Sequence, residues 1–176
     1  PYLGESSVVC NNSLDGLNLT VSSDTDWNGL SLNNQDVQIR TLKVTNNSTL
    51  TLSSFDDFRM MLPGKITVGS GSTLILDNSN IRPCDPDTRW RGIFLENGAS
   101  IELKNNSSIK QSRLGIYNHT DLNSLVDWEG NLSFDYYNFT DSYSETSGNN
   151  SVIINNSTLE DNFTSLVLDG DDNVVY

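Results

Sequence analysis

The fold is decided by the stretch Trp90-Arg91-Gly92-Ile93-Phe94-Leu95-Glu96-Asn97-Gly98-Ala99-Ser100-Ile101-Glu102-Leu103-Lys104-Asn105-Asn106-Ser107-Ser108-Ile109. It contains two short runs in which every second residue is aliphatic, and in a half-buried strand such residues all point to the same side. Asn-Gly separates the runs and suits a tight turn, because both residue types tolerate positive φ. An Asn-Asn-Ser-Ser step follows the second run. We expect the side chains that face the core to be Ile93, Leu95, Ile101, Leu103 and Ile109.

Imperfect copies of this stretch occur elsewhere in the chain. When they are aligned on Leu50, Leu74 and Ile101, the steps are 24 and 27 residues. Residues 27–34 also match residues 90–97 in residue type. The Asn-Asn-Ser step returns at residues 155–159, 50 residues after its counterpart at 105–109. That longer step is either two repeats or one repeat that carries a long loop.

A repeat of this length, built of short strands and turns, predicts a solenoid, because one unit cannot bury its own apolar face. The leucine consensus of leucine-rich repeats is absent, and a propeller blade needs about 40 residues. No stretch has the apolar spacing of an amphipathic helix. We therefore predict an all-β parallel β-helix of roughly five to seven coils, formed by one domain over residues 1–176. Residues 1–13 are a lead-in and residues 118–150 a long loop excursion.

The repeat also resembles a known family. Trp-Arg-Gly-Ile-Phe-Leu from Trp90, then Gly-Ala-Ser-Ile-Glu-Leu from Gly98, then the Asn-Ser step, is similar to the right-handed β-helix repeats of secreted surface proteins of Bacteroidetes-type bacteria. The resemblance covers residues 27–117 and 151–168. It implies a right-handed winding and an extracellular or cell-surface location. Related β-helices include polysaccharide lyases, adhesins, tailspikes and stalk proteins, so the resemblance implies no catalytic residues.

Composition limits the partners. The formal net charge is −13, with 23 acidic and 10 basic residues. Nucleic acid and anionic membranes are poor partners for such a chain, because both need a basic surface. No apolar run of about 18 residues is present, so we expect no membrane span. The chain starts at Pro1, which we interpret as a processed or excised terminus. Cys10 and Cys84 form either one disulfide or two buried thiols.

Each tryptophan stands in a Trp-x-Gly motif, at Trp27, Trp90 and Trp128. One interpretation is structural: the ring closes a corner of the coil and the glycine lets the backbone turn beneath it. The alternative is a platform on which sugars stack. We favour the structural corners, because at Trp27 and Trp90 an apolar residue and a strand follow the motif.

Few residues suggest catalysis. His119 is the only histidine, so neither a histidine metal cluster nor a Ser-His triad is expected. In β-helix lyases carboxylates hold calcium beside a basic residue. The candidates for such a site are Asp85, Asp87, Arg89 and Arg91. We favour a plain surface loop there, so no catalytic residue is assigned. We expect no bound cofactor other than calcium. Its candidate ligands, at the end of the chain, are Asp169, Asp171 and Asp172.

N-glycosylation sequons carry the strongest functional signal. The sequence has 23 Asn and 38 Ser plus Thr, from which chance yields roughly five sequons. The observed ones begin at Asn11, Asn18, Asn46, Asn47, Asn105, Asn106, Asn118, Asn131, Asn138, Asn149, Asn155, Asn156 and Asn162. Two explanations stay open. Either the surface is glycosylated, or the turns of a β-helix favour Asn-Asn-Ser steps and the sequons are a by-product.

The functional hypothesis is a non-catalytic extracellular structural or adhesive protein. In this view the chain is a glycosylated subunit or stalk module of a surface fibre, which assembles end to end through exposed sheet edges. The alternative is a carbohydrate-binding or lyase-like β-helix. Its groove would be lined by carboxylates and by Tyr136, Tyr137 and Tyr143 of the excursion.

Overall fold

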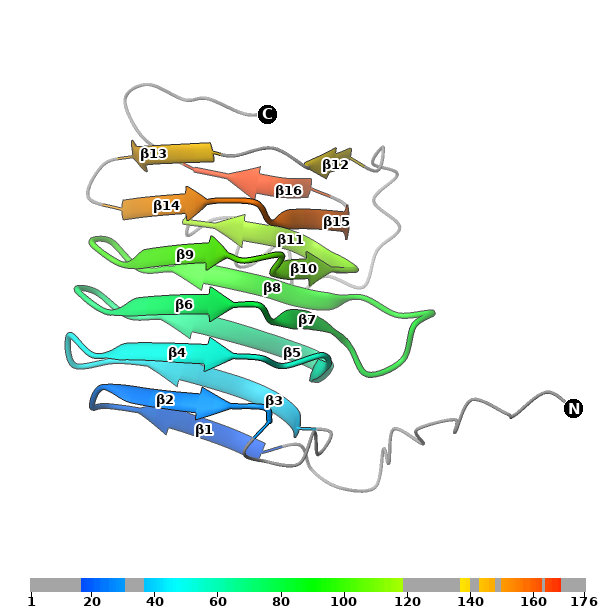
Figure 1. Ribbon diagram of the computed structural model, residues 1–176, viewed down its shortest axis with the longest axis horizontal. Helices are drawn as coiled ribbons and strands as arrows, with labels where there is room; N and C mark the ends of the chain where they lie inside the picture. The colour runs from blue at the N-terminus through cyan, green and yellow to red at the C-terminus, as the bar shows by residue number, and fades with distance from the viewer. Residues whose placement is uncertain are drawn as a thin grey trace, which may run out of the picture.

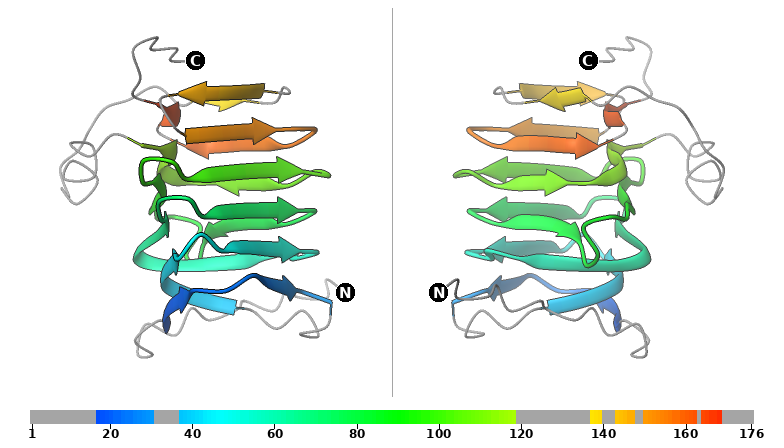
Figure 2. Two further views of the ribbon diagram at one scale, coloured as in Figure 1. Left: turned by 90° about the vertical axis from the view of Figure 1, so that its left-hand side faces the viewer. Right: turned by 90° about the vertical axis from the view of Figure 1, so that its right-hand side faces the viewer.

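The computed structural model describes residues 17–30, 37–118, 137–139, 143–147, 150–162 and 164–168. Within these residues every regular element is a β-strand, which confirms the all-β prediction. The strands stack into a parallel β-helix with three faces (Figure 1). In Figure 1 the front strands run to the right and the rear strands to the left while the chain climbs, so the winding is right-handed. The two side views in Figure 2 show the levels stacked along one axis.

We call the faces first, second and third. The first is a continuous parallel stack of β2 (Thr25–Asn28), β4 (Thr49–Ser53), β6 (Thr73–Asp77), β9 (Ser100–Lys104) and β14 (Asn150–Ile154). The second contains β7 (Asn80–Pro83), β10 (Ser108–Lys110) and β15 (Thr158–Asn162). The third contains β1 (Leu17–Val21), β8 (Trp90–Leu95), β11 (Ser112–Tyr117) and β16 (Thr164–Val167). Two longer strands, β3 (Val37–Val44) and β5 (Phe58–Val68), turn from the second face onto the third.

The repeat alignment is confirmed by the strand register. Leu50 pairs with Leu74, and Leu74 pairs with Ile101. Ile101 then pairs directly with Val152 of β14. The long step is therefore one repeat that carries a long loop, and not two repeats. The chain makes about four turns, so the prediction of five to seven coils was too high.

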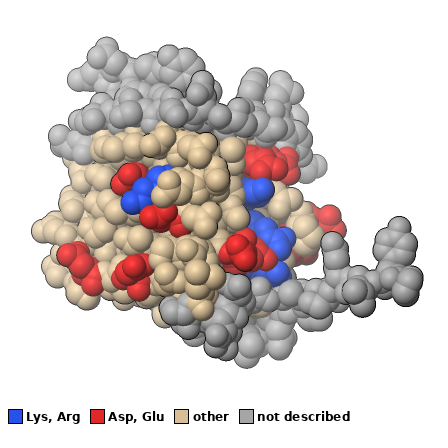
Figure 3. Space-filling model, in the orientation of Figure 1, with Lys and Arg blue, Asp and Glu red and all other residues tan. Residues whose placement is uncertain are grey.

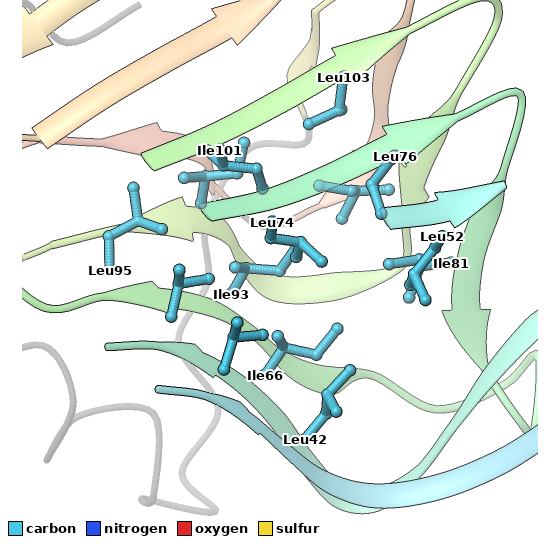
Figure 4. Close-up of a cluster of buried hydrophobic side chains, with 14 of the residues drawn as sticks. Leu42, Leu52, Ile66, Leu74, Leu76, Ile81, Ile93, Leu95, Ile101 and Leu103 are labelled. Atoms are coloured by element: carbon cyan, nitrogen blue, oxygen red, sulfur yellow. The ribbon is translucent and has the colours of Figure 1, made fainter. Parts of the chain in front are cut away.

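The core is a column of aliphatic side chains inside the helix (Figure 4). Every residue expected to face inward from the deciding stretch is at most 1% exposed: Ile93, Leu95, Ile101, Leu103 and Ile109. On β4, β6 and β9 burial alternates strictly, because successive side chains of a strand point to opposite sides. Full burial of one such side chain contributes about 1.5–3 kcal/mol. The stacked column is the main source of stability.

Asparagines occupy the turns because the backbone there has positive φ. Residues 45–48 form a turn from the third face to the first, and residues 104–107 one from the first to the second. In each, both central asparagines have φ between 54° and 63°. Asparagine is enriched in this conformation among residues other than glycine. The serine that ends each turn is buried and bonds back to the turn carbonyl, Ser48 Oγ to Thr45 O at 2.5 Å and Ser107 Oγ to Lys104 O at 2.7 Å.

The two asparagine turns are not equivalent positions of the repeat. Residues 46–47 lie at the corner between the third and first faces. Residues 105–106 and 155–156 lie at the corner between the first and second faces, where Ser108 pairs with Thr158 and Ile109 with Leu159. The same letters occur at both corners because each turn contains at least one asparagine at positive φ: Asn46 and Asn47 at the first corner, and Asn105, Asn106 and Asn156 at the second.

The excursion contributes two antiparallel strands at the last turn. β12 (Tyr137–Phe139) pairs with β15, and β13 (Tyr143–Ser147) pairs with β14. Every described pairing between the other strands is parallel. These two strands therefore lie beyond the final coil on the first and second faces. The lead-in, residues 1–13, and most of the excursion lie outside the described residues.

Candidate functional site

A polar groove of about 370 Å³ lies on the outer side of the second face. Its lining comes from four successive levels, those of β5, β7, β10 and β15: Asp56, Asn80, Arg82, Lys110, Gln111, Glu160 and Asp161. These side chains point outward because their strand neighbours Ile81, Ile109 and Leu159 point into the core. Figure 3 shows basic and acidic side chains intermingled toward the right of the molecule. The groove therefore presents both charges and amides to solvent.

Contacts between adjacent levels hold the groove residues. Lys110 Nζ lies 2.7 Å from Glu160 Oε2, across the paired strands β10 and β15. The Ser108 hydroxyl donates to Asn80 Oδ1 at 2.5 Å. Gln111 Nε2 donates to the carbonyl of Pro86 at 2.9 Å. The polar side chains are thus positioned by the stacking of the coils.

An ion cluster borders one end of the groove. Asp57 accepts hydrogen bonds from Arg59, at 2.9 Å from Nε and 2.6 Å from Nη2, and its carboxylate also bonds Arg82. Arg59 is buried, with 7% of its surface exposed. Burial acts to raise the pKa of the Asp57 carboxyl, but the hydrogen bonds and positive charges of Arg82 and Arg59 outweigh it and lower the pKa below its ordinary value. Asp57 is therefore a fixed anion that orients Arg82 along the groove.

The proposed lyase-like constellation is not assembled. The side chain of Asp85 accepts a hydrogen bond from the backbone amide of Asp87 at 2.9 Å, and the Asp85 carbonyl accepts one from the Thr88 hydroxyl. These hydrogen bonds therefore join residues within the loop. Arg89 instead extends to Asp161, with Nη2 and Oδ1 3.4 Å apart. Arg91 lies on β8 of the third face. Among the described residues, no group of three His, Cys, Asp or Glu side chains is arranged to hold a metal ion.

The sequon asparagines fall into different environments. Those at the turns are exposed on the surface: Asn46, Asn47, Asn105, Asn106, Asn155 and Asn156. Asn18 is exposed as well, and Asn118 is half-buried. The side chains also form ladders along the axis, since Asn105 Nδ2 donates to Asp77 Oδ1 and Asn156 Nδ2 to Asn106 Oδ1, both at 2.8 Å. A turn asparagine can therefore face solvent and still take part in a ladder of hydrogen bonds between levels.

The prediction that Asn162 is a glycosylation site needs correction. Its side chain is fully buried, so it is unavailable for a glycan in this fold. Its Oδ1 accepts from the backbone amide and the hydroxyl of Ser112, at 2.8 and 2.6 Å. Its Nδ2 donates to the carbonyl of Ile109 at 3.2 Å. Asn162 thus binds two levels of the helix together. The sequence offers no sign of this role, because Asn162 follows a run of polar residues at the end of β15.

The tryptophan motifs are not equivalent either. Trp90 begins β8 and is fully buried, and its Nε1 donates to the carbonyl of Lys110 at 2.9 Å. Trp27 lies within β2 on the first face, pairs with Leu52 and is half-buried against the core. The match between residues 27–34 and 90–97 was therefore wrong as a repeat alignment. What the two motifs share is a glycine that lies against the backbone of the next level, since an added Cβ would lie 2.4 Å from the Ser54 carbonyl oxygen at Gly29 and 1.5 Å from the Leu114 carbonyl oxygen at Gly92.

Cys84 is buried and disulfide-bonded. Cys10, the other cysteine of the chain, lies outside the described residues, so the pairing of the two stays a prediction. Other predicted site residues also lie outside the described side chains. They are Trp128, His119, Tyr136, Tyr137, Tyr143, the acidic residues Asp169, Asp171 and Asp172, and the sequon positions Asn11, Asn131, Asn138 and Asn149.

Comparison of the chain with protein-family models, with curated proteins and with solved structures finds no match. The parallel β-helix implied by the family resemblance is confirmed by the fold. The bacterial family itself remains a prediction. In the part of the chain that the structure describes, no helix is long and apolar enough to cross a membrane.

Proposed function

We propose that this protein is a non-catalytic extracellular structural or adhesive module, a rigid β-helical spacer that carries N-linked glycans on its corners. The observation that carries the proposal is the exposure of the turn asparagines, all within sequons. Each exposed pair is followed by a buried serine that anchors the turn, such as Ser107 or Ser157. A stacked scaffold of this kind presents attachment sites in fixed directions at about 4.8 Å per level.

Glycan occupancy tests the proposal directly. The protein is isolated from its natural source, or from a secreting host with N-glycosylation, and its glycopeptides are analysed by mass spectrometry. We expect glycans on the turn asparagines and none on Asn162. Asn105→Gly with Asn106→Gly removes two acceptors while glycine keeps the positive φ of the turn. Unmodified turn asparagines in native material would contradict the proposal.

End-to-end assembly into a fibre is a further part of the proposal. Among the described strands, β2 ends the first-face sheet at one end of the helix, and β13 ends it at the other. The outer edge of a terminal strand is a template for strand addition from another copy. Sedimentation velocity and electron microscopy of the glycosylated protein test this. We expect elongated, concentration-dependent assemblies, and a strictly monomeric compact species would refute the fibre.

A carbohydrate-binding or carbohydrate-cleaving β-helix is the second candidate, and the groove on the second face favours it. Its amides and charges, from Asn80, Gln111, Arg82 and Lys110, provide donors and acceptors for the hydroxyls of a sugar. A glycan array with the wild type and the Arg82→Ala variant tests binding, and Lys43→Ala is the control because Lys43 lies on the third face. A cleavage assay on acidic polysaccharides, with and without calcium, tests the lyase version. The absence of binding and cleavage would leave the structural proposal.

A further inference from the structure

The chain contains two Asn-Gly pairs, at Asn28 and at Asn97. In such a pair the backbone nitrogen of the glycine can attack the side-chain carbonyl carbon of the asparagine, because glycine has no Cβ to hinder the approach. The attack has two requirements. The asparagine side chain must be able to rotate toward the glycine nitrogen, and the glycine N–H must not be held in a hydrogen bond. The structure meets these requirements at one pair and not at the other.

The pair Asn28-Gly29 meets neither requirement. The amide of Gly29 is buried and donates to the carbonyl of Ser53 at 2.8 Å. The side chain of Asn28 is held in a local turn, because its Oδ1 accepts from the amide of Leu30 at 2.9 Å. Attack at this pair would therefore break two hydrogen bonds, one of them buried between two levels of the helix.

The pair Asn97-Gly98 meets both requirements. It lies at the corner between the third and first faces, between β8 and β9, and the side chain of Asn97 is exposed. Within the described residues, no hydrogen bond involves the Asn97 side chain or the Gly98 N–H. The φ of Gly98 is 81° and the amide of Ala99 donates to the carbonyl of Glu96 at 2.9 Å, as in a type II turn. A Cβ added to Gly98 would meet its nearest neighbour at 3.6 Å, so there is room beside the turn.

Ser70, on the preceding level, contacts the peptide group that joins Asn97 to Gly98. Its hydroxyl donates to the carbonyl oxygen of Asn97 at 2.7 Å. The attacking form of the Gly98 nitrogen is the deprotonated amide, and resonance shares its negative charge with that same oxygen. A donor aimed at an oxygen on which charge develops stabilises the charge. Ser70 therefore favours the reactive form of the Gly98 amide.

We propose that Asn97 is a site of spontaneous deamidation, promoted by Ser70, and that Asn28 is protected by the fold. The inference is independent of the proposed function, because alanine follows Gly98 and Asn97 is not in a sequon. The modification replaces a neutral amide with a carboxylate at a corner of the helix. It therefore adds a negative charge to a chain whose formal net charge is already −13.

The reaction consumes one water molecule and releases one ammonia. The Gly98 nitrogen gives its proton to a base in solvent and bonds to Cγ of Asn97. The side-chain nitrogen takes a proton from water and leaves as ammonia, so that a cyclic succinimide remains. Water then opens the ring. Cleavage of the bond from Cγ to nitrogen gives aspartate, and cleavage of the original peptide bond gives isoaspartate, whose main chain runs through the former side chain.

Peptide mapping of the folded, full-length protein tests the proposal. The protein is incubated in mildly alkaline buffer, mass spectrometry follows the conversion of amide to carboxyl, and labelling by an isoaspartyl methyltransferase detects isoaspartate. We expect Asn97 to react at least about tenfold faster than Asn28, because attack at Asn28 requires local opening of a buried hydrogen bond. In the denatured chain we expect similar rates at the two pairs. Equal rates in the folded protein, or no reaction at Asn97 under conditions in which the denatured chain reacts, would overturn the proposal.

Variants of Ser70 test its role. Ser70→Ala removes the hydroxyl, and we expect deamidation at Asn97 to slow by about fivefold while Asn28 is unaffected. Ser70→Thr keeps a hydroxyl and should react like the wild type. Loss of stability would speed the reaction, because an opened chain exposes both pairs, so a slower rate cannot come from unfolding. If the alanine and threonine variants react at Asn97 at the same rate, the role of Ser70 is refuted.

Discussion

Asn162 allows a quantitative test of how the levels of the helix are held together. The change Asn162→Ala removes the partners of three buried groups: the amide and hydroxyl of Ser112 and the carbonyl of Ile109. A buried polar group left without a partner costs about 1–3 kcal/mol. Water that enters the space left by the amide offsets part of this cost. We expect a loss of about 3 kcal/mol in the free energy of unfolding, which lowers Tm by about 6–12 °C.

Chemical denaturation followed by circular dichroism measures this loss, and Asn155→Ala is the control. Asn155 lies in the same coil but is exposed and does not have positive φ, so its replacement should cost less than about 0.5 kcal/mol. The Ser112→Ala change should cost less than Asn162→Ala, because the Ser112 amide still bonds Asn162. A loss below about 1 kcal/mol for Asn162→Ala would refute the argument that this side chain joins the levels.

Two further predictions concern the backbone and the ion cluster. Gly92→Ala should destabilise by more than about 3 kcal/mol or prevent folding, because an added Cβ would lie 1.5 Å from the carbonyl oxygen of Leu114. Gly98→Ala is also at positive φ, but its Cβ would make only ordinary van der Waals contacts, 3.6 Å from Ser70 Oγ and 3.7 Å from the Gly71 amide nitrogen, so it should cost about 1 kcal/mol. Similar thermal unfolding of both variants would contradict this. The lowered pKa of Asp57 means that its stabilising contribution is present above about pH 4, the ordinary carboxyl pKa, and is lost as the pH falls through the lower folded-state pKa. Asp57→Asn should therefore be less stable than the wild type at pH 7, and denaturant titrations at pH 7 and pH 3 should show the difference shrinking at the lower pH; a constant difference would exclude this role.

Tertiary structure changed the interpretation of the sequons most. By sequence alone, Asn106 and Asn162 are the same signal, an asparagine two residues before a hydroxyl side chain. The fold places Asn106 on the outer corner and Asn162 in the core. Burial of a polar side chain depends on which donors and acceptors neighbouring levels bring to it, and those neighbours are about 50 residues away in the chain.

The groove likewise depends on long-range pairing. Asn80, Lys110 and Glu160 carry no common motif, and they meet only because β7, β10 and β15 stack in register. The candidate lyase residues show the reverse, since Asp85 and Arg89 are neighbours in sequence but bind in different directions. Proximity along the chain was therefore a poor guide to the site.

The sequence by itself determined the coil: strand alternation, asparagine turns with positive φ, and the equivalence of Leu50, Leu74 and Ile101. These features are local or repeat at a fixed period, so each coil shows them on its own. The tertiary structure decided the number of turns, because only the pairing of Ile101 with Val152 shows that the excursion adds no coil. It also decided which polar side chains are buried. A solenoid brings its levels into contact only after stacking, and the chemistry of its surface is created by that stacking.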